Sequence, residues 1–253
     1  MDIITDSLLI FRREMTLSLR NPAWVIIGLT QPILYLAFFG PLLTNMSHVP
    51  GFPPGNPWQV YVPGLLVQLG LFGSAFVGFG IIADLRAGVI ERMRVTPVRR
   101  LSLLLGRVLR DVVVLTVQSL VLMVAATAFG LRTGIISAVL ALIIVALLAI
   151  SLASLSYAGG LITKDEDAFA PLTNMLSVPV MLLSGILLPM SMAPLWLQWV
   201  CRFNPMLYVV EAMRQVFRGQ YNNATVYEGI TAAIVMAIIS LAIGTRTFRR
   251  ENA

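Results

Sequence analysis

The stretch DLRAGVIERMRVTPVRR, residues 84–100, decides the fold because it interrupts an otherwise apolar chain. It contains five arginines and two acidic residues. No Asp, Glu, Lys or Arg lies between Arg20 and Asp84, and none lies between Asp111 and Arg132. Uncharged runs of this length are typical of membrane spans, and a dense charged segment between them cannot lie in hydrocarbon. The sequence therefore predicts a loop at a membrane face, and its arginines predict the cytoplasmic face.

Composition indicates a multi-pass membrane protein rather than a soluble domain. Apolar residues make up 58% of the 253 residues and charged residues 12%, whereas soluble domains carry about 25% charged residues. The formal net charge of +6 fits membrane orientation and contact with lipid headgroups, so we expect no nucleic-acid partner. The single Cys201 excludes an intramolecular disulfide and a multi-cysteine metal site. The single His48 excludes a histidine cluster.

Apolar periodicity predicts an all-α fold, with an amphipathic helix and six spans in one transmembrane domain over residues 1–253. The helix covers residues 1–21, and its apolar stripe consists of Ile4, Leu8, Phe11, Met15 and Leu19. It is too charged to span, so we expect it at the membrane interface, with an ordinary solvated helix as the alternative. A span needs about 20 apolar residues. The predicted spans are residues 24–43, 61–83, 102–129, 135–162, 171–188 and 230–245.

Several residues inside these spans invite a functional interpretation. Gly70, Ser74 and Gly78 lie four apart in the second span and favour close helix contact. Arg107 and Asp111 are helical neighbours that can pair, but we expect them, with Arg110, to extend to the headgroups rather than to form a proton relay. Candidates for a substrate path, equally typical of helix packing, are Gln31, Tyr35, Gln68 and Phe72.

Residues 190–219 are predicted to form two short helices that re-enter the membrane from the outside. The segment is aromatic and amphipathic, Asn204-Pro205 splits it, and each piece is too short to span. The aromatic side chains suited to the headgroup level are Trp196, Trp199 and Tyr208. Placing both termini in the cytoplasm puts 14 of the 18 basic residues there, as expected from the enrichment of Lys and Arg in cytoplasmic segments.

The sequence lacks the residues of an ATP-hydrolysing chain. A Walker A motif requires Gly before its Lys, whereas the only lysine, Lys164, follows Thr163 and precedes Asp165. We identify no clear acidic residue within the membrane, which a proton- or sodium-coupled carrier usually needs. Energy for uphill transport is therefore expected from a partner. A secondary carrier or channel working without ATP is the alternative, and an intramembrane enzyme lacks a nucleophile–base pair.

Three stretches in this order resemble the membrane subunits of ABC-2 type ABC transporters, and are similar to the daunorubicin-resistance permease group. They are the amphipathic helix ending in Arg20-Asn21-Pro22, the loop GVIERMRVTPVRR at residues 88–100, and FNPMLYVVEAMR at residues 203–214. The resemblance implies a second permease, identical or homologous, and two separate ATP-binding subunits. Those subunits, and not this chain, would bind ATP and Mg²⁺. It also implies export of a drug, lipid or glycolipid across a bacterial cell (inner) membrane.

The resemblance makes residues 84–100 the coupling loop, with a coupling helix at residues 89–95. Pro97 disfavours helix at the preceding residue, so the helix would end there. Arginines that only set topology would need neither Glu91 nor a helix ended by proline. The expected contacts to the ATP-binding subunit are Val89, Glu91, Arg92, Met93, Arg94, Pro97, Lys164 and Asp165. The residues assigned to the family's re-entrant segment are Trp196, Trp199, Asn204, Pro205, Tyr208, Glu211 and Arg214.

Overall fold

The computed structural model describes residues 3–21, 23–46, 55–89 and 100–251, and every regular element within them is a helix. This confirms the all-α prediction for the described residues. In chain order the helices are α1 (Ile3–Arg20), α2 (Ala23–Met46), α3 (Pro57–Ala75), α4 (Val77–Arg86), α6 (Arg100–Ala128), α7 (Ile135–Thr163), α8 (Glu166–Leu183), the short 3₁₀ helix η1 (Met190–Met192), α9 (Leu195–Cys201), α10 (Pro205–Phe217) and α11 (Ala224–Glu251).

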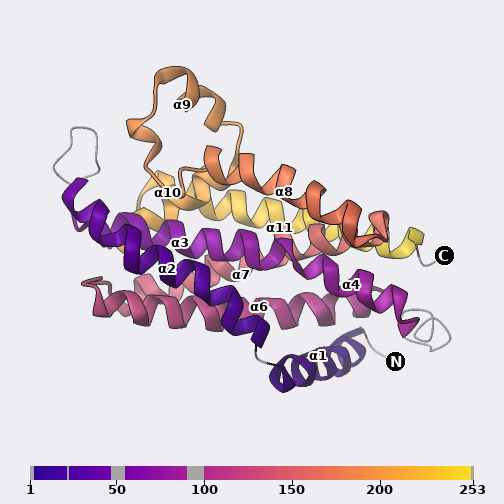
Figure 1. Ribbon diagram of the computed structural model, residues 1–253. Helices are drawn as coiled ribbons and strands as arrows, with labels where there is room; N and C mark the ends of the chain where they lie inside the picture. The colour runs from indigo at the N-terminus through magenta and orange to yellow at the C-terminus, as the bar shows by residue number, and fades with distance from the viewer. Residues whose placement is uncertain (1–2, 22, 47–54, 90–99, 252–253) are drawn as a thin grey trace.

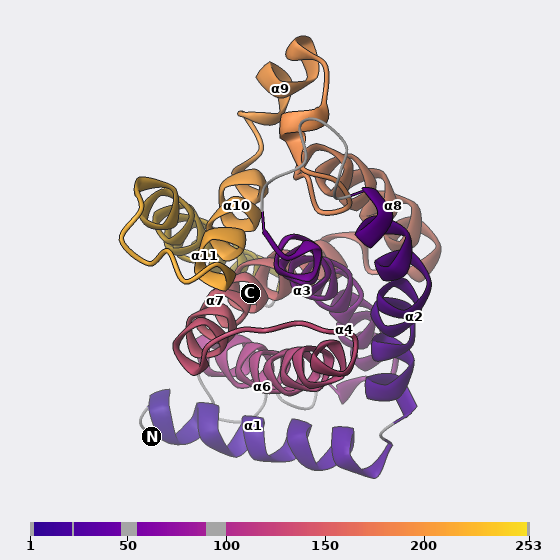
Figure 2. The same ribbon diagram turned by 90° about the vertical axis from the view of Figure 1, so that its left-hand side faces the viewer.

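Within the described residues, five candidate spans are long and apolar enough to cross a membrane: α2, α3 with α4, α6, α7 and α11. Figure 1 shows the long helices running side by side along one direction, with α2 crossing them obliquely. The view along the bundle in Figure 2 shows α1 lying crosswise beneath α6. α11 is longer than the predicted span 230–245, because its polar ends continue the helix beyond the apolar run.

The fifth predicted span is displaced along the chain. α8 covers Glu166–Leu183 rather than residues 171–188, and it is not among the five candidate spans. Two acids in its first turn, Glu166 and Asp167, reduce its apolar character. The helix ends at Leu183, before the predicted residue 188. Gly185 follows with φ +72°, a conformation that costs glycine little.

The second predicted span, 61–83, is not one continuous helix. α3 ends at Ala75 and α4 begins at Val77. The Ser156 hydroxyl on α7 bridges the break, because it donates to the Ala75 carbonyl (2.7 Å) and accepts the Gly78 N–H (2.9 Å). Backbone groups freed by a helix break in a membrane need such partners. The break is therefore stabilised by a residue from another helix.

α7 lies at the centre of the bundle and packs against α3, α4, α6, α10 and α11. The predicted small-residue contact is confirmed at Gly78, where a Cβ would overlap the Ser156 carbonyl and the Phe169 ring. Gly160 on α7 likewise approaches the Gly78 carbonyl. At Gly70 the neighbour is at ordinary contact distance. Of these two glycines, Gly78 therefore lies against the α7 backbone and Gly70 does not.

The two ends of the bundle are built by different segments. At one end, Ile10 on α1 and Phe248 on α11 share a buried cluster with residues of α4, α6, α7 and α8. We call this the charged end, since it also holds the ion pairs described below. At the opposite end, the Gln59 amide donates to the Arg132 carbonyl (2.8 Å). The described N- and C-terminal helices therefore both contribute to the core of the charged end.

Candidate functional site at the charged end

The described part of the predicted coupling loop, residues 84–89, begins in the last turn of α4. Gly88 adopts φ +66°, and its N–H donates to the Leu85 carbonyl (3.1 Å), as in helices ended by glycine. Val89, the first expected contact to the ATP-binding subunit, is partly buried. The other expected contacts in this loop lie outside the described residues, so their role stays a prediction: Glu91, Arg92, Met93, Arg94 and Pro97.

A buried arginine joins three helices beside this loop. Arg107 on α6 is 4% exposed, and its guanidinium pairs with Asp84 on α4, where the charged stretch begins. The same guanidinium lies 3.9 Å from the Glu14 carboxylate on α1. A charge removed from water needs partners of this kind. Because both acids come from other helices, the ion pairs hold α1 and α4 against α6.

A second ion-paired group connects α6 to α7. Asp111 is 2% exposed, with Arg110 2.9 Å away, and it accepts a hydrogen bond of 2.6 Å from the Tyr157 hydroxyl. The possible pairing of Arg107 with Asp111 does not form, because Arg107 pairs with Asp84 on α4 and Asp111 with Arg110 and Tyr157. The expectation that these residues extend to the headgroups is also wrong for Arg107 and Asp111, which are buried. Asp111 is thus a buried carboxylate near the start of the predicted third span.

The turn between α7 and α8 reaches the same place. Arg86, the last residue of α4, donates to Asp165 (2.8 Å) and lies 3.5 Å from Glu166. Lys164 in this turn adopts φ +54°. The structure thus brings the two expected contacts of this turn, Lys164 and Asp165, next to the start of the coupling loop. About half of the Arg86 and Asp165 side chains is exposed, so a binding partner can reach them.

The buried acids of α1 were missed by sequence reasoning, although the sequence carries a signal for them. The stripe that we singled out is largely exposed, whereas the face against α6 contains Asp6, Ile10 and Glu14. These three residues are four apart, so they share one helix face. At Gly106 on α6 a Cβ would overlap Ile10, and this close contact buries the acids.

The candidate substrate-path residues divide into two pairs. Gln31 is exposed and Tyr35 partly buried on α2, and the Tyr35 carbonyl accepts a hydrogen bond from Tyr61 (3.2 Å). On α3, Gln68 is 1% exposed and Phe72 is partly buried. α2 packs on α3, but among the described residues no hydrogen bond joins the two pairs. The Gln68 amide has no hydrogen-bond partner there either.

The outer segment breaks where the sequence predicts. α9 ends at Cys201 and α10 begins at Pro205. The Asn204 side chain caps α10 by accepting the Met206 N–H (3.1 Å) and donates to the Val180 carbonyl on α8 (2.8 Å). Asn204 therefore both starts α10 and fixes it to α8.

Of the predicted aromatic residues of this segment, the two tryptophans are exposed and Tyr208 is partly buried. Trp196 and Trp199 are 67% and 64% exposed on α9, which projects from the bundle in Figure 1. The Arg202 guanidinium lies 4.5 Å from the centre of the Trp199 ring. The Tyr208 hydroxyl donates to the Arg202 carbonyl (3.1 Å). The exposure of Trp196 and Trp199 fits a lipid-facing segment. Membrane re-entry stays a prediction.

Arg214 on α10 anchors this segment to two other parts of the chain. It is 2% exposed, donates to the carbonyls of Val60 (3.1 Å) and Gly185 (2.6 Å), and pairs with Glu211 (2.7 Å). Burial lowers the pKa of Arg214, while Glu211 opposes this shift. An arginine nevertheless stays charged, so the three contacts act as charge-assisted bonds between α10, α3 and the end of α8.

Comparison with known proteins assigns the chain to one family. The sequence profile of the family described as "ABC-2 type transporter" matches residues 6–217. A putative transport permease, ycf38, of Cyanophora paradoxa is 26% identical over 200 residues, 78% of this chain and 69% of that protein. The probable doxorubicin resistance ABC transporter permease protein DrrC of Mycobacterium tuberculosis (strain ATCC 25618 / H37Rv) is 25% identical over 213 residues, 83% and 76% of the two chains. The daunorubicin resistance ABC transporter permease protein DrrB1 of Streptomyces coeruleorubidus is 26% identical over 200 residues, 77% and 70% of the two chains.

Proposed function

Since the chain belongs to the ABC-2 type transporter family, we propose that it is the permease subunit of an ATP-driven exporter in a bacterial cell membrane. The observation that carries the proposal is the set of ion pairs at the charged end. Asp84 and Arg86, the first two charged residues of the coupling loop, are paired with residues of α6 and of the α7–α8 turn. Movement of the loop would therefore be transmitted to several helices together.

The energy source in this proposal is a pair of separate ATP-binding subunits, which hold ATP and Mg²⁺. Their closure on ATP would push the coupling loop. The Asp84–Arg107 ion pair joins α4 to α6 next to α1. Because of this pair, the two helices α4 and α6 would shift as one unit rather than slide past one another. A path would then open between this permease and a second, identical or homologous copy.

We propose six membrane crossings, with α8 as the fifth. α8 starts beside Arg86 at the charged end, and its eighteen residues extend about 27 Å at 1.5 Å per residue. Beyond its last turn, Gly185 shares Arg214 with Val60 from the first turns of α3, at the other end of the bundle. This path puts both described terminal helices on one side, which we assign to the cytoplasm.

The substrate in this proposal is hydrophobic or amphipathic, such as a drug, a lipid or a glycolipid. The names of two relatives, which refer to doxorubicin and daunorubicin resistance, support a drug. Gln68 is the path candidate that the structure favours, since its buried amide has no partner among the described residues. A buried amide without a partner gains a hydrogen bond when a substrate with a polar group reaches it.

The test is export in vesicles by the chain assembled with the ATP-binding subunit that co-purifies from native membranes. Glu91→Ala with Arg94→Ala should abolish ATP-driven export and weaken the association, whereas Arg132→Ala, at the opposite end, should leave both unchanged. Intact export and association in the double variant would refute the coupling role. Export that survives ATP depletion but collapses with an ionophore would instead establish a secondary carrier. Asp111 does not favour that alternative, since Arg110 and Tyr157 already pair with it.

A further inference from the structure

α1 has three distinct faces, which follow from the turn of about 100° per residue in an α-helix. One face is buried against α6 and contains Ile10 and Glu14. About 140° around the helix lies the apolar stripe, in which Ile4, Leu8 and Leu19 are 74%, 52% and 73% exposed. The third face, on the other flank, is basic. The helix therefore presents an apolar flank and a basic flank on opposite sides of its contact with the bundle.

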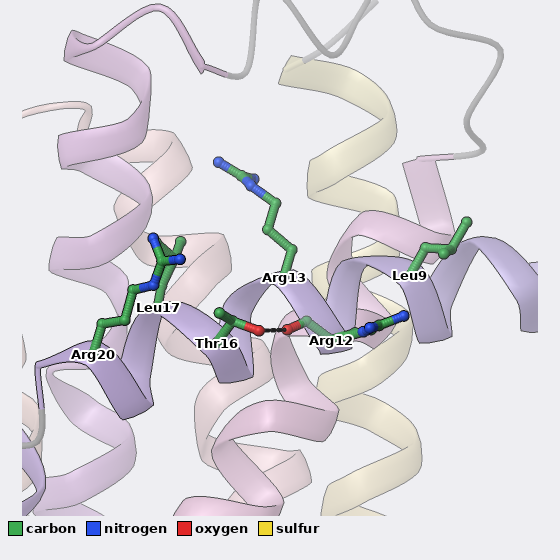
Figure 3. A pocket seen from close by; sticks show the side chains of 6 residues that line it. All are labelled: Leu9, Arg12, Arg13, Thr16, Leu17 and Arg20. Atoms are coloured by element: carbon green, nitrogen blue, oxygen red, sulfur yellow. Dashed lines mark hydrogen bonds between the residues drawn. The ribbon is translucent and has the colours of Figure 1, made fainter.

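The basic flank forms a shallow groove of six side chains, which Figure 3 shows from close by. The groove is lined by Leu9, Arg12, Arg13, Thr16, Leu17 and Arg20. In Figure 3, Arg13, Leu17 and Arg20 stand along one edge of α1, and Arg12 and Thr16 lie on the adjoining surface. Leu9 and Leu17 are 55% and 49% exposed. Cationic and apolar side chains thus alternate within one surface.

The positive charge of this groove is largely uncompensated. Within the described residues, the groove arginines take part in one ion pair, between Arg13 and Glu14 at 3.5 Å. That carboxylate also lies 3.9 Å from Arg107. Arg12 and Arg20 have no acidic partner in the described part of the chain. The groove therefore complements an anion that the chain itself does not supply.

We propose that this groove on α1 binds the phosphate of anionic lipid headgroups, such as phosphatidylglycerol. A guanidinium can bind phosphate through two parallel hydrogen bonds, and three of them surround the groove. With the apolar flank in the acyl region, a crosswise helix places its basic flank at the level of the phosphates. The half-exposed leucines then contact lipid rather than water. The proposal requires a membrane but no ATP-binding subunit.

The test is native mass spectrometry of the purified full chain with phosphatidylglycerol or phosphatidylcholine added as the probe. Each basic residue near an anionic membrane contributes roughly a fivefold change in affinity. Arg12→Gln, Arg13→Gln and Arg20→Gln together should therefore lower phosphatidylglycerol retention about 100-fold and leave phosphatidylcholine retention unchanged. The same three positions changed to Lys keep the charge and lose the two-bond geometry. Phosphatidylglycerol retention by this variant should therefore lie between that of the original chain and that of the Gln variant.

The matched control removes three arginines near the C-terminal end of α11: Arg246→Gln, Arg249→Gln and Arg250→Gln. It should leave retention within about threefold of the original chain, since the α1 groove is intact. An equal loss in this control would overturn the proposal, because it would show diffuse attraction to a basic surface. Displacement of the lipid by inorganic phosphate alone would also overturn it, in favour of a soluble anion. All three variants should keep the helical circular dichroism of the original chain, since the groove arginines are exposed.

Discussion

The buried ion pair between Asp84 and Arg107 makes the sharpest prediction about the charged end. Arg107→Met keeps the length of the side chain and removes its charge. The substitution leaves Glu14 and Asp84 without this partner, and their side chains are 9% and 29% exposed. Removing one member of a buried pair costs about 3–5 kcal/mol. Because Asp84 regains water, we expect the lower value, a loss of about 3 kcal/mol in the free energy of unfolding.

A double-mutant cycle separates the pair from its surroundings. Asp84→Asn retains Arg107 beside Glu14, so it should cost about 2 kcal/mol, the value of a hydrogen bond to a charged group. The double variant should be about as stable as Arg107→Met alone, which gives a coupling energy of about 2 kcal/mol. The free energy of unfolding is measured in mixed detergent micelles by circular dichroism for the original chain, the two single variants and the double variant. In the assembled exporter, the same variants should lower the amount of substrate exported per ATP hydrolysed.

The control is Arg86→Met, which removes a half-exposed pair with Asp165 and should cost at most about 1 kcal/mol. Two results would refute the reasoning. The first is a loss below about 1 kcal/mol for Arg107→Met, which is the range of exposed pairs. The second is additivity of the two substitutions, since residues that interact directly are expected to depart from it.

Three further changes test the packing. Ser156→Ala should cost about 1–3 kcal/mol of unfolding free energy, because it frees the groups bridged at the α3–α4 break; no loss would mean that the break is stable by itself. Gly78→Leu should cost at least about 3 kcal/mol by forcing α4 from α7, and an unchanged unfolding midpoint would contradict the close contact. Asn204→Ala should loosen α9 by about 2 kcal/mol and raise maleimide labelling of Cys201 roughly 30-fold, since this thiol is buried and burial raises its pKa. Asn204→Asp keeps the acceptor that caps α10, so its increase in Cys201 labelling should be smaller. Equal labelling rates in the Ala and Asp variants would show that the cap does not contribute to the protection of Cys201.

Long apolar runs made the main helices predictable from the sequence, because a span requires many consecutive apolar residues. Residues 24–43, 102–129 and 135–162 correspond closely to α2, α6 and α7. The outer break was also predictable, since Asn204-Pro205 combines a capping residue with a proline at the first helical position. Such signals lie within a few residues of the feature that they determine.

The break at Phe76 and the start of α8 were not predictable in this way. The bonds that bridge the break come from Ser156, far along the chain on another helix. The start of α8 is polar, and Arg86 from the end of α4 pairs with its acids. Apolar periodicity describes each helix alone, so it contains no information about partners contributed by the rest of the bundle.

The same limit explains the candidate site. The sequence placed the charged loop at the end of a span, but the four-residue spacing of Arg107 and Asp111 predicted a partnership within α6. The structure instead pairs Arg107 with Asp84 on α4, and Asp111 with its chain neighbour Arg110 and with Tyr157 on α7. Neighbouring positions on a helix define which side chains share a face. They do not define which of several charges in a bundle lies closest.

Burial also separates two roles of arginine in this chain and strengthens the proposed orientation. An arginine fully buried and paired with an acid has no access to headgroups, so it should not count toward the charge bias that orients the protein. This removes Arg107 from the cytoplasmic total and Arg214 from the outer total. Thirteen cytoplasmic basic residues then face three outer ones, compared with fourteen and four before. The buried arginines that hold helices together are thus not the ones that set the orientation, whereas the half-exposed Arg86 contributes to both.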